Sequence, residues 1–148
     1  MRGRRLVVVA VAAIGFLVAS AVLARWLATE NRERSAVLGL LRDEARGDAA
    51  RMLDRLEGCA ESAPCRAAVA ANARTLRRRG EVKILAYSSG TRYAAGSATG
   101  RTRVAWGIVD RGLPVVQCVD VRRDGSVLAG HSITLQRLSR PIGREGSC

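Results

Sequence analysis

The chain has 148 residues, of which 25 are basic and 13 acidic, for a formal net charge of +12 at pH 7. Among the basic residues only Lys83 is a lysine, a bias typical of high-GC bacterial genomes, so the arginines alone do not indicate bidentate phosphate recognition. Nucleic acid is not an expected partner. The length excludes two domains, because the residues that follow the apolar N-terminal segment suffice for one modest core.

The first predicted element is a membrane span. Residues 6–24 are uncharged, with Ser20 as their one polar side chain, and arginines precede them. A helix of this length approaches the roughly 30 Å thickness of the bilayer hydrocarbon, and basic residues mark its cytoplasmic end. The sequence therefore predicts a cytoplasmic stub at 1–5, a single-pass cell-membrane anchor at 6–28, and an extracytoplasmic domain after it.

A cleavable signal peptide is the alternative, because residues 22–24 place small side chains ahead of a cut at Arg25. The apolar segment is longer than the about 7–15 residues of a signal-peptide core, and Trp26 suits a membrane interface. An uncleaved signal-anchor is therefore preferred. Gly15 and Ala19 form one small-residue step through which two such helices could associate, although chance explains this spacing better because alanine is so abundant here.

Residues 29–80 have the pattern of helices. Apolar side chains at spacings of three and four predict that the first helix continues through 29–58, with mixed charges on a solvated face. A second helix is expected over 65–79 and is ended by Gly80 as its C-cap. The three arginines at 77–79 would then interact favourably with the helix dipole.

Beyond the helices the pattern changes to period two. Strands are expected at 81–88, 102–109, 114–123 and 126–138. The small, flexible stretch 88–100 is expected to be a loop or to hold a short extra strand near Tyr93. Helices followed by strands predict an α+β domain with an antiparallel β-meander of about four strands, in which 81–148 is the sheet part and 29–80 the helical part.

The cysteines at 59, 65, 118 and 148 all follow the apolar segment, and outside the cytoplasm they are expected to form disulfides. Cys59 and Cys65 form the expected local bridge, because a short segment with a helix-breaking proline separates them. Cys118 with Cys148 follows by elimination and would tie the C-terminal segment to a central strand. The cysteine spacing and the lack of a nearby histidine do not fit zinc, so no metal site is expected.

Asp124 and Gly125 are expected to form the turn between the last two strands. A two-residue loop would place Cys118 opposite His131, which would make a candidate nucleophile and base. A three-residue loop at 123–125 pairs apolar residues more consistently, so it is preferred, and it separates Cys118 from His131. No catalytic residue or cofactor is expected, and the protein is expected not to be an enzyme.

The layout resembles that of type IV pilins: a hydrophobic N-terminal helix, its amphipathic continuation, a meander, and a bridge closing at the C-terminus. Gly15-Phe16 matches the small-then-aromatic processing junction, and Ser20 stands where pilins carry a glutamate. The resemblance implies a subunit of a filament or secretion system. A secreted basic protein and a small ligand-sensing domain are further alternatives.

The preferred hypothesis is a non-enzymatic binding or scaffold domain of the bacterial cell envelope. Its positive charge would attract an anionic envelope polymer, a lipid headgroup surface or an acidic partner protein. The binding surface is expected at the basic end of the sheet, formed by Arg101, Arg103, Arg111, Arg122, Arg123, Arg137 and Arg140.

Overall fold

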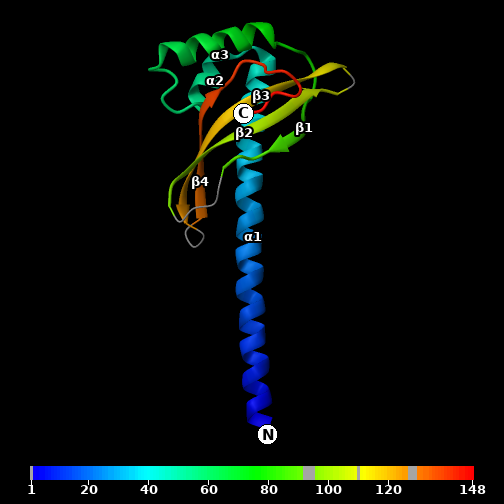
Figure 1. Ribbon diagram of the computed structural model, residues 1–148, viewed down its shortest axis with the longest axis vertical. Helices are drawn as coiled ribbons and strands as arrows, with labels where there is room; N and C mark the ends of the chain where they lie inside the picture. The colour runs from blue at the N-terminus through cyan, green and yellow to red at the C-terminus, as the bar shows by residue number, and fades with distance from the viewer. Residues whose placement is uncertain (1, 92–95, 110, 127–129) are drawn as a thin grey trace.

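The computed structural model describes residues 2–91, 96–109, 111–126 and 130–148 (Figure 1). Its helices are α1 (Arg2–Arg46), α2 (Ala49–Arg55) and α3 (Ala63–Thr75), and its strands are β1 (Val82–Ser88), β2 (Ala98–Ile108), β3 (Arg111–Ser126) and β4 (Gly130–Leu138). The strands form one antiparallel sheet in the order β1-β2-β3-β4, so the predicted α+β fold with a β-meander is confirmed.

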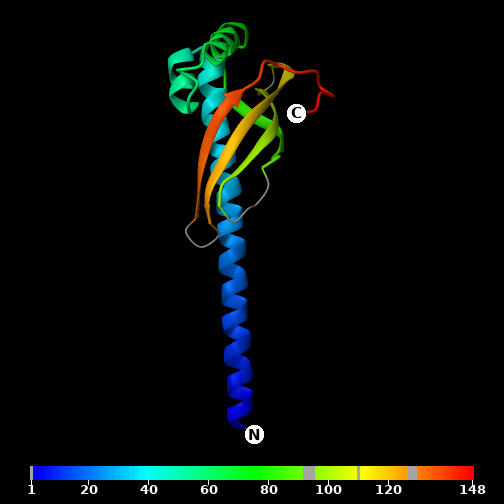
Figure 2. The same cartoon turned by 60° about the vertical axis from the view of Figure 1, so that its left-hand side comes forward.

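The two halves of α1 have opposite surroundings. Its apolar N-terminal half projects away from the rest of the protein in both views (Figures 1 and 2), and Phe16 is 72% exposed. Among the described residues, α1 is the one helix long and apolar enough to cross a membrane. In its second half, Val37 and Leu40 are fully buried against the sheet and the short helices. One helix thus supplies both the exposed apolar segment and the centre of the core.

α1 ends earlier than the predicted helix 29–58. Gly47 adopts a φ of 76°, a left-handed conformation that glycine reaches without steric cost and that commonly ends helices. Asp48 then caps α2, and its side chain accepts a hydrogen bond of 3.1 Å from the backbone N–H of Arg51. The apolar spacing continues across this break, which is why the periodicity alone predicted one helix.

α3 is also shorter than expected, and Gly80 is not its C-cap. The chain leaves α3 after Thr75 and returns to α1, where the backbone N–H of Arg78 donates to the carbonyl of Ala45 over 2.8 Å. Gly80 has a φ of 130°, and a Cβ at this position would collide with the side chain of Ile108 on β2. Glycine is therefore required here by a close approach to the sheet, and the arginines at 77–79 lie beyond the helix.

The inner face of the sheet packs on the second half of α1. Trp106 of β2 and Val119 and Val121 of β3 are fully buried there. α2 and α3 lie at the end of the domain that is far from the apolar half of α1 (Figure 1). The core is therefore bounded by the sheet on one side and by helices on the other.

Both predicted disulfides are present, with Cα atoms 5.3 Å apart in Cys59–Cys65 and 5.7 Å apart in Cys118–Cys148. After β4 the chain continues beside β3, where the N–H of Ile142 donates to the carbonyl of Val116 over 2.8 Å. The second bridge therefore holds a C-terminal segment that extends the sheet ladder.

Replacing Cys59 and Cys65 with alanine is expected to lower the free energy of unfolding by about 2 kcal/mol, because the unfolded chain gains the entropy that a short closed loop denies it. Urea unfolding of the full chain in neutral detergent micelles, followed by Trp106 fluorescence, measures this loss. Glu61→Ala changes an exposed residue of the same loop and is the matched control. A midpoint equal to that of the control would contradict the prediction.

The β3–β4 hairpin differs from both predicted registers. Asp124 and Gly125 lie within β3, where Gly125 pairs with His131. The predicted turn at these two residues is therefore wrong, because β3 continues through them and β4 begins at Gly130. The alternative of a loop or a short extra strand around Tyr93 concerns residues outside the described ranges. Gly125, which pairs with His131, lies seven residues or roughly 23 Å along β3 from Cys118. Cys118 is also held in a disulfide, so Cys118 and His131 form no catalytic dyad.

Candidate functional site

The seven arginines predicted as a binding surface do not form one open patch. Arg123 is 2% exposed, so its assignment to a surface is wrong. Arg101 is neutralised by Asp120, with 2.7 Å between Nε and Oδ1, and Arg122 by Glu57 and Asp124, with 2.8 Å to each carboxylate. These carboxylates raise the pKa of both guanidinium groups. Three of the seven cations are thus already paired.

The other four differ among themselves. Arg103 donates to the carbonyls of Gly146, over 3.0 Å, and Arg144, so it holds the C-terminal segment against the sheet. The side chain of Arg111 lies outside the described part of the structure. Arg137 and Arg140 are exposed and form no ion pair with the described residues.

Arg123 of β3 belongs to a buried charged cluster centred on Glu33 of α1. Its Nε and a terminal guanidinium nitrogen lie 2.7 Å and 2.5 Å from Oε2 of Glu33, which is fully buried. The other carboxylate oxygen accepts hydrogen bonds from the hydroxyls of Tyr87, Thr102 and Ser89, at 2.6, 2.9 and 3.0 Å. Burial and the adjacent carboxylate both raise the pKa of Tyr87. Because the cluster joins α1 to three strands, it orients the sheet on the helix.

A second buried network surrounds Glu44. Its Oε1 accepts from the amide of Gln117 over 2.8 Å, and the carbonyl of that amide accepts from the indole of Trp106 over 2.6 Å. Oε2 of Glu44 has no hydrogen-bond partner among the described residues. Burial is the main cause that raises the pKa of Glu44 from 4.5 to about 7. Glu44, Gln117 and Trp106 are all fully buried, so this network is internal to the fold.

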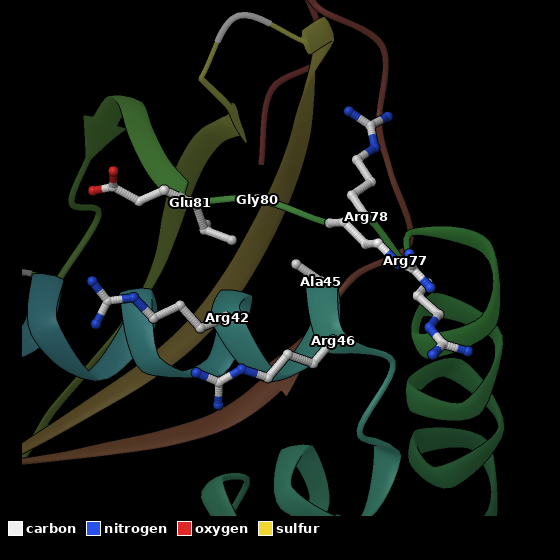
Figure 3. A pocket seen from close by; sticks show the side chains of 9 residues that line it. Arg42, Ala45, Arg46, Arg77, Arg78, Gly80 and Glu81 are labelled. Atoms are coloured by element: carbon white, nitrogen blue, oxygen red, sulfur yellow. The ribbon is translucent and has the colours of Figure 1, made fainter.

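An open site of high charge lies where α1 ends. A cleft of about 500 Å³ is formed between the last turns of α1 and the segment that follows α3. Figure 3 shows Arg42 and Arg46 on α1, with Arg77 and Arg78 on the other segment. The lining consists of Arg42, Ala45, Arg46, Arg77, Arg78, Arg79, Gly80, Glu81 and Val82, and we call it the arginine cleft.

The backbone holds the two walls of the arginine cleft together. Arg78 donates its N–H to α1, as described above, and its guanidinium donates to the carbonyl of Leu113 over 3.2 Å. The same guanidinium lies 6.0 Å from the ring centroid of Trp106. At Gly47 a Cβ would approach the carbonyl oxygen of Ala73 to 3.0 Å, so α1 and α3 meet closely. The partial negative charge at the C-terminal ends of both helices favours cations here.

The positive charge of the arginine cleft is largely uncompensated. Arg46 lies 3.4 Å from a carboxylate oxygen of Asp43, and Glu81 is the one acidic residue in the lining. The others form no ion pair within the part of the chain that the structure describes; they are Arg42, Arg77, Arg78 and Arg79. Like charges held together in this way attract anions.

Sequence reasoning missed this site. The arginine triplet was assigned to helix capping, and Arg42 to a solvated helix face. The available signal was that no acidic residue lies within the triplet or in the segment 62–80. Arg42 and residues 77–79 line one cleft because the ends of α1 and α3 meet. No pattern in the sequence indicates that these two helix ends lie together.

Among the described ranges, no group of three or more His, Cys, Asp or Glu side chains is arranged to hold a metal ion. No protein-family model matches the chain, and no curated protein or solved structure shows significant similarity to it. Functional inference therefore rests on the geometry of the chain itself.

Proposed function

We propose that the protein is a single-pass, membrane-anchored binding or scaffold domain of the bacterial cell envelope, with its C-terminal domain outside the cytoplasm and no enzymatic activity. The observation that carries this proposal is the continuity of α1, which runs without a break from exposed apolar residues into the centre of the core. The basic residues at 1–5 favour a cytoplasmic N-terminus, and the two disulfides suit an oxidising location.

In this proposal the folded domain begins directly at the membrane surface, and the arginine cleft lies at the end of the domain that is far from the membrane. Thr29, just beyond the proposed anchor at 6–28, is already 5% exposed. The arginines at 42 and 46 lie roughly 20–25 Å further along the helix axis. A ligand of the arginine cleft would therefore come from the envelope beyond the headgroups of the anchoring bilayer.

The intact mass of the protein, purified from membranes without reductant, tests the anchor. We expect a chain that begins at Met1 and lacks four hydrogens, because the anchor is retained and two disulfides form. A chain that begins at Arg25 would instead indicate a secreted basic protein. A C-terminal epitope accessible on intact spheroplasts is expected as well, and an epitope exposed only after lysis would contradict the proposed orientation.

A pilin-like subunit is the second candidate. The observation that favours it is the packing of a long N-terminal helix on an antiparallel meander whose C-terminal segment is closed by a disulfide. A mature chain beginning at Phe16 would support this candidate. It is second because residues 16–24 would then be the uncharged remainder, and they cover only about 14 Å as a helix.

A further inference from the structure

We propose that the arginine cleft binds a linear, phosphate-bearing polymer of the envelope. This inference deepens the proposed function and rests on it for the place where the polymer is met. The binding itself depends only on the cleft, so it can be tested apart from membrane orientation.

The distribution of charge identifies the cleft as the place for an anion. Several arginines elsewhere on the domain are neutralised within the fold, as in the pairs of Arg101 with Asp120 and Arg123 with Glu33, whereas Arg137 and Arg140 are exposed outside the arginine cleft. In the cleft, guanidinium groups from two separate segments face solvent without carboxylate partners. Because arginine does not lose its proton in proteins, these groups stay cationic at every physiological pH, and an anion bound between the two segments would relieve their mutual repulsion.

The arrangement of the arginines favours phosphate over carboxylate. A planar carboxylate offers two oxygens that suit one guanidinium fork from one side. A phosphate group presents its oxygens tetrahedrally, so consecutive phosphates of a polymer can accept from guanidinium groups on different segments, such as Arg42 on α1 and Arg77 or Arg79 on the opposite segment. The cleft has two basic walls, and this matches a ligand that accepts hydrogen bonds from both.

The same lining disfavours nucleic acid. Single-stranded nucleic acids gain much of their affinity by stacking bases on open aromatic side chains. The aromatic residue beside the cleft, Trp106, is fully buried, and Arg78 lies over its ring. The remaining apolar lining is Ala45 and Val82, both nearly fully buried, so the cleft provides charge without a stacking surface.

A polymer fits the site better than a single phosphate ion. One ion can contact only part of a cleft of about 500 Å³, whereas consecutive phosphates of a chain can engage several of its arginines together. Linked contacts of this kind raise the overall affinity above that of each contact alone. We therefore expect inorganic phosphate to compete only weakly with a polymer.

The test measures the binding of fluorescently labelled poly(glycerol phosphate) to the full chain in phosphatidylcholine nanodiscs, which carry no net lipid charge. In the cleft variant Arg77→Gln/Arg79→Gln we expect affinity to fall by about tenfold or more, because two charge-assisted contacts are removed. The matched control, Arg137→Gln/Arg140→Gln, removes the same charge from exposed arginines and is expected to change affinity by less than about twofold. Arg78 is left unchanged because it contacts Trp106.

Three results would overturn the proposal. Equal losses in the two variants would show that net charge alone attracts the polymer. Equal affinity for polyglutamate of the same length would remove the preference for phosphate. Binding to phosphatidylglycerol vesicles without binding to the polymer would identify lipid as the anion. Urea unfolding of both variants confirms that they are folded, and the spheroplast epitope tests orientation separately.

Discussion

Replacement of Arg123 with methionine is expected to lower the free energy of unfolding by about 3–5 kcal/mol, the largest effect of any change considered for this protein. The guanidinium is 2% exposed and lies 2.5 Å from the carboxylate of Glu33, which is fully buried on α1. Without it, the carboxylate retains hydroxyl donors but loses its counter-charge in a medium of low polarity. Urea unfolding of the full chain in neutral micelles measures the loss.

Two control variants separate the buried charge from general effects of arginine removal. Arg101→Met breaks an exposed ion pair and is expected to have little effect, because water and salt already screen that pair. Glu33→Gln/Arg123→Met is expected to recover much of the lost stability, since the neutral amide oxygen still accepts from the surrounding hydroxyls. If Arg123→Met destabilised no more than Arg101→Met, the cluster would not stabilise the fold.

The burial of Arg123 shows how one turn assignment can mislead. In β3 this residue is in phase with Val119 and Val121, both fully buried, and that alternation was visible in the sequence. Sequence reasoning instead placed a loop at 123–125, because Asp-Gly is a strong hairpin signal. In the structure both residues lie in β3, where the side chain of Asp124 forms an ion pair with that of Arg122, and this contact lowers the pKa of Asp124.

The fold class, strand order and the Cys59–Cys65 bridge were predictable because each follows from local patterns: period-two strands, short connections and cysteine spacing. The Cys118–Cys148 bridge then followed by elimination. The end of α3 was not predictable, since it depends on a tertiary contact, whereas Gly47 and Asp48 carry local signals for the end of α1 that the continuing apolar spacing hid. Gly80 is glycine because Ile108 approaches it, a contact between residues on different elements. The arginine cleft likewise depends on contacts between different elements, those of the segment after α3 with α1. Reasoning from helix caps therefore assigned the arginines at 77–79 to the helix dipole.

Glu44→Gln is expected to stabilise the protein at alkaline pH. Burial raises the pKa of Glu44 from 4.5 to about 7, so the folded protein holds this proton more tightly than the unfolded chain. Between pH 4.5 and 7 the unfolded chain releases the Glu44 proton, whereas the folded protein retains it. Rising pH therefore favours the unfolded chain over this range and lowers the free energy of unfolding. Above it the accumulated loss of stability is about 3 kcal/mol.

The variant removes that loss, so at pH 8 its free energy of unfolding should exceed that of the wild-type chain by up to about 3 kcal/mol, whereas near pH 4 the two should be nearly equal. The amide can still accept from Gln117, so the network to Trp106 is retained. Urea unfolding of both chains at pH 4, 6 and 8 checks this, and taking the difference between them cancels the titration of the other carboxylates. A difference that stays constant with pH would mean that the Glu44 carboxyl has the same pKa in the folded and the unfolded chain, so that its burial has no effect on its proton.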